Sequence, residues 1–168
     1  MKVLDTKKYM YEIEWISKNN PVEIALHYIV RNVIESAVGH EYIITDVSSR
    51  RQTKKQLTFN FYSSTGFPDL VLFKKGDVKP ICSVEIKYLP FRKGQTFTEN
   101  KTQVKGHALK YGFALFTNGL EWVLIDKVGN IKFSIVLGKY IKNQSQVIKW
   151  NDEINFTKLM KALSRIIN

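Results

Sequence analysis

The sequence predicts an α/β domain in which helices flank a β-sheet. Helical and strand-like hydrophobic patterns alternate along the chain, 44% of its 168 residues are apolar, and no linker or repeat divides them. A chain of this length and composition can bury a sizeable core as one unit. We expect a single domain over 1–168, with a core at about 20–126 and a C-terminal strand and helix extension at 127–168.

The first clear element is a helix over about 20–38. Asn20 suits the N-cap, Pro21 suits the first helical position, and Gly39 follows the last apolar residue. Seven apolar residues at helical spacing form one stripe along it: Val22, Leu26, Ile29, Val30, Val33, Ile34 and Ala37.

Four strand-like runs follow, at 42–47, 56–62, 67–73 and 81–87, separated by polar or glycine-containing stretches. A second helix is expected over 100–111, closed by Gly112. Gly106 inside this helix costs about 1 kcal/mol relative to Ala. It can alternatively mark close packing against a neighbour.

Two further strands, at 113–117 and 121–126, are joined through Asn118-Gly119. This dipeptide is a strong hairpin signal because both of its positions tolerate positive φ. Trp122 is expected to pack in the core. A strand over 131–137 and an amphipathic helix over 156–167 complete the pattern, whereas 138–151 carries no clear one.

The chain is strongly basic, with 26 Lys and Arg against 15 Asp and Glu and a formal net charge of +11. Such a surplus favours a polyanionic partner, first of all nucleic acid, although a basic protein without a polymer partner remains an alternative. Cys82 is the only cysteine, which excludes an internal disulfide and fits a reducing cytoplasm. No window is apolar enough to span a membrane. We therefore expect a cytoplasmic protein without membrane contact.

One group of charged residues on two neighbouring predicted strands indicates a catalytic site. Pro68-Asp69 stands at the start of one predicted strand, and Glu85-Ile86-Lys87 at the end of the next. Residues two apart on a strand share a face, so Glu85 and Lys87 project together, and the neighbouring strand can bring Asp69 beside them. Two carboxylates and the Ile86 carbonyl oxygen would make a site for Mg²⁺, with Mn²⁺ as a substitute. Lys87 would orient the attacking water, or stabilise charge, in phosphodiester hydrolysis.

The same residues have an ordinary structural interpretation. The strand can be half-exposed, with Glu85 and Lys87 simply solvated. Asp69 fits this interpretation less well, because it shares a strand face with Val71 and Phe73, where an unpaired carboxylate is costly.

The strings Gly66-Phe67-Pro68-Asp69-Leu70-Val71-Leu72-Phe73 and Val84-Glu85-Ile86-Lys87 resemble motifs II and III of the PD-(D/E)XK nuclease superfamily. Downstream, 103–111 and 116–122 are similar to the segment after these motifs in the N-terminal nuclease domain of type I restriction enzyme restriction subunits. The resemblance covers about 20–126. It implies a restriction-endonuclease-like core, in which helices flank a central mixed β-sheet, and a Mg²⁺-dependent DNA endonuclease.

The resemblance does not include the ATP-driven motor of those restriction subunits. The motor of those restriction subunits needs a phosphate-binding loop, and the sequence holds no Gly-x-x-x-x-Gly-Lys-Ser/Thr motif, so ATP is not expected. A homodimer, or association with the subunits of a restriction complex, would fit this family. A module that binds nucleic acid or a partner without turnover, while keeping the nuclease fold, is the competing hypothesis.

Two more residues gain catalytic roles from the resemblance. Glu23 corresponds to a helix glutamate that approaches the metal site, and Gln103 to a residue that orients the catalytic lysine or contacts DNA. Each has a capping-box alternative, with Asn20 and Asn100 respectively. The family often shows Gln-x-x-x-Tyr, whereas here His107 stands four residues after Gln103 and the tyrosine, Tyr111, comes one turn later. Because a lone helical histidine is more often a surface or packing residue, we assign His107 no catalysis.

A basic run lies in a predicted loop between two strands, and within the nuclease hypothesis we expect it to contact the DNA backbone. Simple solvation of the same charges is the alternative. The residues concerned are Arg50, Arg51, Lys54 and Lys55.

Overall fold

The computed structural model describes residues 5–19, 23–48, 61–89, 93–141 and 147–166. Four helices are found there: α1 (Thr6–Asn19), α2 (Ile24–Val38), α3 (Phe97–Tyr111) and α4 (Ile154–Leu163). The strands of the main sheet are β1 (Tyr42–Asp46), β2 (Leu70–Lys74), β3 (Cys82–Ile86), β4 (Phe113–Thr117), β5 (Glu121–Asp126) and β6 (Ile131–Val136). A separate small pair is formed by β7 (Gly138–Tyr140) and β8 (Ile148–Trp150).

The main sheet is mixed. Its six described strands lie in the order β1-β2-β3-β4-β5-β6, and every neighbouring pair is antiparallel except β3 and β4. A parallel pair needs a long crossover connection, and α3 provides it. The expected α/β architecture with a mixed sheet and flanking helices is therefore confirmed.

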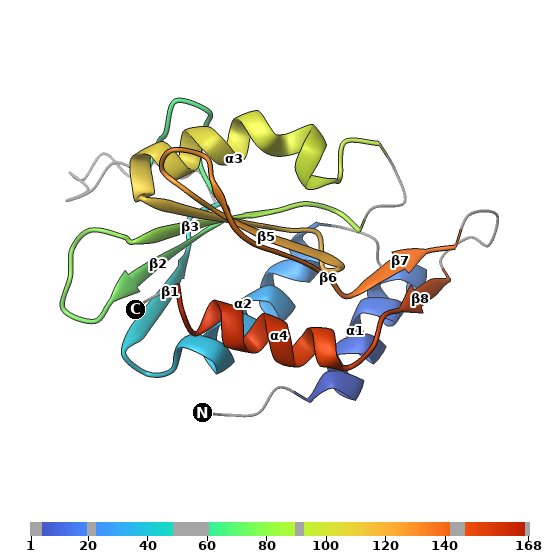
Figure 1. Cartoon of the computed structure of the whole chain (residues 1–168). Helices are drawn as coiled ribbons and strands as arrows, with labels where there is room; N and C mark the ends of the chain where they lie inside the picture. The colour runs from blue at the N-terminus through green and yellow to red at the C-terminus, as the bar shows by residue number, and fades with distance from the viewer. Residues whose placement is uncertain (1–4, 20–22, 49–60, 90–92, 142–146, 167–168) are drawn as a thin grey trace.

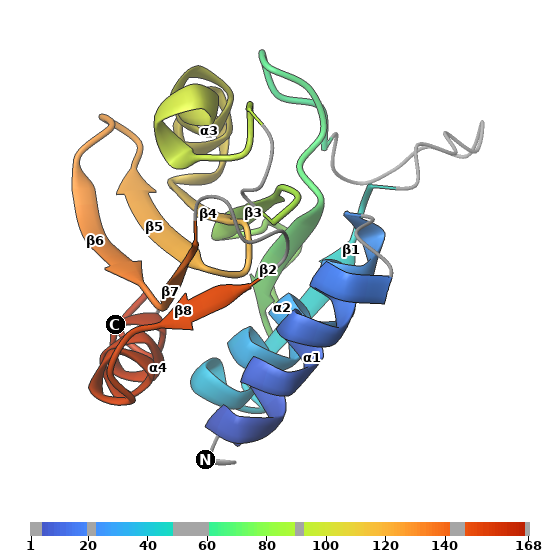
Figure 2. The same cartoon turned by 90° about the vertical axis from the view of Figure 1, so that its right-hand side faces the viewer.

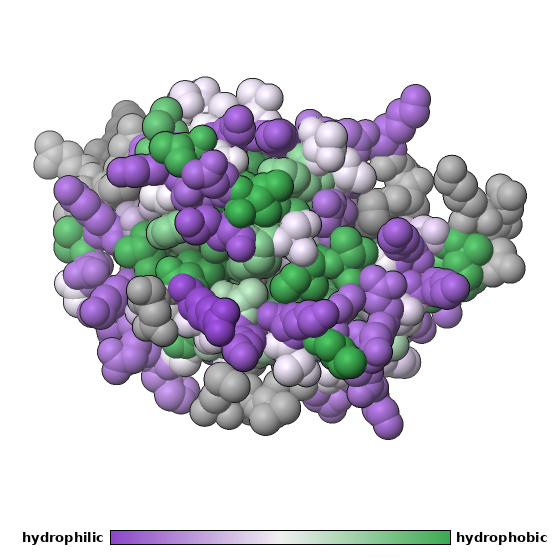
Figure 3. Space-filling model, in the orientation of Figure 1, coloured by the Kyte–Doolittle hydropathy of each residue, from purple (hydrophilic) through white to green (hydrophobic). Residues whose placement is uncertain are grey.

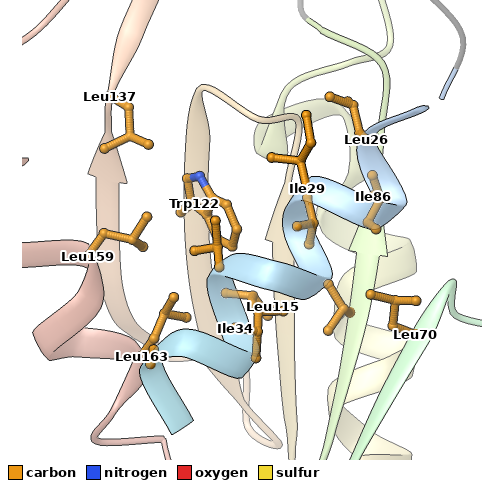
Figure 4. Close-up of a cluster of buried hydrophobic side chains, with 14 of the residues drawn as sticks. Leu26, Ile29, Ile34, Leu70, Ile86, Leu115, Trp122, Leu137, Leu159 and Leu163 are labelled. Atoms are coloured by element: carbon orange, nitrogen blue, oxygen red, sulfur yellow. The ribbon is translucent and has the colours of Figure 1, made fainter. Parts of the chain in front are cut away.

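Helices cover both faces of this sheet. Figures 1 and 2 show α3 on one face and α1, α2 and α4 on the other. The larger hydrophobic core lies on the face of α2 and α4, and Figure 4 shows Leu26, Ile34, Trp122 and Leu159 among its side chains. A second cluster lies beneath α3: Phe97, Val104, Ala108, Ala114, Phe116, Val123 and Ile125.

Several sequence-based expectations are confirmed. The hairpin through Asn118-Gly119 joins β4 and β5 in antiparallel register, with Gly119 at φ 84°. Trp122 is completely buried. The strands expected at 42–47, 67–73, 81–87 and 131–137 are present with slightly different ends. The strand expected at 56–62 lies mostly outside the described residues, and 61–62 belong to no strand.

The helix α1 was not predicted. Its charged residues interrupt the apolar ones, yet Tyr9, Ile13, Ile16 and Ser17 are buried along one side of it. Charges every few positions are what an amphipathic helix carries on its exposed face. Likewise, β7 and β8 lie in the stretch for which no pattern was recognised, and α4 spans 154–163 in place of 156–167.

The capping-box alternative at α3 needs correction, and the one that pairs Asn20 with Glu23 remains a prediction. The structure describes α2 from Ile24, and Glu23 directly before it makes no capping hydrogen bond through its side chain. The partner expected for Glu23, Asn20, lies outside the described residues. At α3 the capping box is formed by Thr96 and Glu99, not by Asn100 and Gln103. This helix therefore begins one turn earlier than expected.

Gly106 marks close packing, as the alternative interpretation held. A Cβ atom at this position would lie 2.9 Å from Thr65 Cβ and closer still to the Oγ1 and Cγ2 atoms of that residue. The Thr65 hydroxyl donates to the Gln103 carbonyl oxygen at 2.9 Å. The turn that contains Thr65 is thus pressed against α3, with no room for a side chain between them.

On the face shown in Figure 3, hydrophilic residues surround several hydrophobic ones. Among the described residues, no helix has both the length and the apolar character that crossing a bilayer requires.

The contact at Gly106 predicts a destabilising substitution. Ala is the better helix former by about 1 kcal/mol, but overpacking against Thr65 should outweigh this, so we expect Gly106→Ala to lose about 1 to 2 kcal/mol of unfolding free energy. Urea denaturation measures it. Thr102→Ala, at an exposed position of the same helix, is the matched control and should be neutral or slightly stabilising. Equal stability of the two variants would contradict the tight contact.

Candidate functional site

The start of β2 and the end of β3 bring Asp69 beside Glu85-Ile86-Lys87. Leu70 pairs with Val84 in the antiparallel register, and the Asp69 N–H donates to the Val84 carbonyl oxygen at 3.0 Å. The Asp69 side chain then reaches β3, where its Oδ2 accepts a hydrogen bond of 2.7 Å from the Ile86 N–H. The juxtaposition expected from the strand pattern is present.

Glu85 is buried, although it is a carboxylate in the middle of a sheet. Only 2% of it is exposed, and the other β3 residues are buried too, so the interpretation as a half-exposed strand is wrong. In Figure 4, Ile86 points into the larger core on the side of α2. Since successive strand residues point to opposite faces, Glu85 points toward α3.

Two side chains compensate the Glu85 carboxylate. Lys87 Nζ donates to Oε1 at 2.5 Å, and His107 Nε2 lies 3.1 Å from Oε2. Both oxygens therefore have a partner, as a buried charge requires.

Lys87 is held in its charged form. Burial by itself lowers the pKa of Lys87, but the adjacent Glu85 carboxylate, together with Glu23 and Asp69, outweighs burial, and the pKa is raised. The side chain is an ammonium at neutral pH. It can donate hydrogen bonds or offset negative charge, but it cannot accept a proton from water.

Asp69 sits in an unfavourable electrostatic environment. Burial, and then the negative charge of Glu85, raises the pKa of Asp69 to about 6, although the Ile86 N–H and His27 act in the opposite direction. His27 Nε2 lies 3.9 Å from Asp69 Oδ1, and its Nδ1 lies 3.3 Å from Asp46 Oδ2. A cation at this position would relieve the cost of the buried charge.

Glu23, directly before α2, belongs to the same electrostatic cluster. Burial raises the pKa of Glu23, while the Lys87 charge and a hydrogen bond from the Tyr88 backbone oppose the rise; the Glu85 carboxylate adds to it. Glu23 is therefore close enough to Lys87 and Glu85 to feel their charges. The role beside a metal ion that the resemblance implies for Glu23 remains a prediction.

Gln103 is not part of this cluster in the described structure. Gln103 is half-buried on α3, and its side chain makes no hydrogen bond with the described residues. Its backbone carbonyl oxygen accepts from the Thr65 hydroxyl. Its contact with the catalytic lysine or DNA remains a prediction. The four basic residues at 50, 51, 54 and 55 lie outside the described residues.

His107, to which the sequence assigned no catalytic role, contacts Glu85 directly. It is completely buried, and its Nδ1 lies 2.8 Å from Ser63 Oγ. Two signals could have indicated its burial. It continues the apolar stripe of Val104, Ala108 and Tyr111 at helical spacing, and it replaces the Tyr of the family pattern. Its partner Ser63 has no comparable signal in the sequence.

The donor set fits Mg²⁺. Among the described residues no three His, Cys, Asp or Glu side chains are grouped so that they could hold a metal ion, but Mg²⁺ needs only one or two carboxylates besides water and phosphate. A carboxylate has about four lone-pair sites, so Glu85 keeps acceptor capacity beside its two partners. In a strand the N–H and C=O of one residue point the same way, so the Ile86 carbonyl faces the Asp69 side.

Comparison of the chain with protein-family models, with curated proteins and with solved structures finds no match.

The environment of Asp69 predicts a stabilising substitution. A carboxyl pKa raised from 3.8 to about 6 on folding means that ionisation opposes folding: the penalty is absent below about pH 3.8, grows up to about pH 6 and is complete above it. At pH 7.5 without metal, we expect Asp69→Asn to gain about 2 kcal/mol of unfolding free energy.

Denaturant unfolding in a chelating buffer at pH 4 and pH 7.5 measures this gain. Asp77→Asn, on the exposed turn after β2, is the matched control and should be neutral at both pH values. An Asp69→Asn protein no more stable than the wild type at pH 7.5 would show that the carboxylate is not strained.

Proposed function

We propose that the chain is a Mg²⁺-dependent DNA endonuclease domain of the PD-(D/E)XK type, with a restriction-endonuclease-like core similar to the nuclease domain of type I restriction subunits. The observation that carries this proposal is the convergence of Asp69, Glu85 and Lys87 where β2 begins and β3 ends. The mixed sheet with helices on both faces is compatible with that core.

In this proposal, different residues of the chain would hold the metal ion and stabilise charge during hydrolysis. Asp69, Glu85 and the Ile86 carbonyl oxygen would hold the metal ion. When bound, Mg²⁺ supplies Lewis-acid chemistry at the phosphate and lowers the pKa of a water. Lys87, kept protonated by Glu85, would place positive charge beside a phosphate oxygen or orient the attacking water. Glu23 would help to hold that ammonium in place.

The net charge of +11 supports DNA as the substrate, because phosphate neutralisation dominates affinity for nucleic acid. Arg50, Arg51, Lys54 and Lys55 remain the proposed backbone contacts. A cytoplasmic location, a homodimer or a restriction complex also belong to the proposal.

A second function is favoured by one observation. Both Glu85 oxygens already have protein partners, Lys87 and His107, so the carboxylate is compensated without a metal ion. A module of the same fold that binds nucleic acid or a partner protein, without turnover, would need nothing more.

Cleavage assays separate the two functions. We expect wild-type protein to cut plasmid and linear DNA with Mg²⁺ or Mn²⁺, without ATP, and Asp69→Asn or Lys87→Met to lose at least about 100-fold in rate. Asp77→Asn and Lys79→Met, at exposed positions, are the matched controls. Thermal unfolding of each variant confirms that it is folded.

Two results would decide against an endonuclease. One is cleavage by the wild-type protein that the Asp69 and Lys87 variants reproduce, which would indicate a contaminating nuclease. The other is salt-dependent DNA binding without cleavage under either metal and without metal uptake, which would support the binding module. Labelled RNA, assayed in parallel, tests the choice of DNA.

A further inference from the structure

His107 is the only described side chain on α3 that hydrogen-bonds Glu85. It has no exposed surface, and its ring spans from Glu85 on one side to Ser63 on the other. A histidine buried in this way must satisfy both ring nitrogens, and both have a partner here.

The hydrogen-bond inventory fixes which nitrogen donates to Glu85. An ionised carboxylate only accepts, so His107 Nε2 carries a proton and donates to Glu85 Oε2. In a neutral ring, Nδ1 then accepts from the Ser63 hydroxyl. In a doubly protonated ring, Nδ1 donates to Ser63 Oγ, whose hydroxyl donates to the Gly66 carbonyl oxygen at 2.8 Å. The donation to Glu85 is the same in both forms.

The turn that holds the His107 ring also leads, along the chain, to Asp69. Ser63 and Gly66 close a turn through a hydrogen bond of 2.9 Å from the Ser63 N–H to the Gly66 carbonyl oxygen. This turn is pressed against α3 at Gly106, the residue before His107. Asp69 follows Gly66 by three residues. One short segment therefore anchors the ring that holds Glu85 and leads directly to the other carboxylate.

Lys87 alone cannot set the orientation of Glu85. Its flexible four-carbon stem carries a compact charge that contacts a single carboxylate oxygen, Oε1. The imidazole is a rigid ring clamped between two residues, and it contacts the other oxygen. Two fixed points define the direction of a carboxylate, whereas one does not.

We infer that His107 is a positioning residue of the metal site: its Nε2–H fixes the Glu85 carboxylate in the orientation that receives the ion, and Ser63 fixes the ring. This inference rests on the proposed function. Residues that orient metal-binding side chains typically contribute 10- to 100-fold to metal affinity.

Two substitutions of similar polarity test the inference on the full chain. The amide nitrogen of His107→Gln can take the place of Nε2, whereas that of His107→Asn reaches only the place of Nδ1. We expect Mn²⁺ to bind about 10- to 100-fold more weakly to the Asn variant and with near wild-type affinity to the Gln variant. Electron paramagnetic resonance of free Mn²⁺ measures both, without any activity assay.

Two further measurements keep the test informative if a position-107 variant fails to fold. Ser63→Ala keeps the imidazole of His107 but removes the Nδ1 partner that fixes the ring, so it should weaken Mn²⁺ binding in the same direction. In the wild-type protein, ¹⁵N NMR of His107 should show a proton on Nε2. A ring without that proton would overturn the inference.

The outcomes separate the two claims. If the wild type binds Mn²⁺ and the Gln, Asn and Ser63→Ala variants all bind it equally well, the role of His107 fails while the metal site stands. If the wild-type protein takes up no Mn²⁺, the metal site of the proposed function fails, and the role of His107 fails with it.

Discussion

A buried carboxylate is the constraint on which the rest of this structure depends. Glu85 lies in a strand whose residues are all buried, and 2% of it is exposed. An isolated charge in such a place would cost several kcal/mol, which only close partners can offset. Lys87 and His107 provide one partner for each oxygen. The fold therefore depends on the positions of these two side chains as well as on the hydrophobic core.

The topology explains how those partners arrive. Lys87 directly follows β3, two residues after Glu85, and the extended backbone by itself brings it to the same side. His107 comes from α3, the crossover that the parallel pair β3 and β4 requires. The Thr96 capping box sets where this helix begins, and the absence of a side chain at Gly106 sets how closely it approaches the 63–66 turn. These packing details place the imidazole over Glu85.

The cluster is not arranged for stability alone. Three carboxylates, Glu23, Asp69 and Glu85, surround one ammonium in a chain that is otherwise rich in cations. Burial and mutual repulsion raise the pKa values of Asp69 and Glu23, so their ionised forms oppose folding. Places where a protein tolerates such a conflict are commonly its functional sites. A bound cation is the simplest way to relieve it.

Local patterns by themselves determined much of this protein. The two-residue period of a strand was enough to place Glu85 and Lys87 on one face, and Asn118-Gly119 was enough to predict the hairpin between β4 and β5. At α3, two residue pairs had the spacing of a capping box. The spacing of Asn100 and Gln103 satisfied the capping-box rule as well as that of Thr96 and Glu99 does, and only the folded backbone distinguished them.

Tertiary structure alone decided the surroundings of Glu85. His107 is 22 residues from Glu85 in the chain and 44 from Ser63, so no periodicity links the three. The sequence also left open whether Glu85 was solvated or buried, because an alternating strand looks the same in both cases. The physical reason is that burial and long-range hydrogen bonds depend on which elements pack together, and for Glu85 that means α3 packing on the sheet.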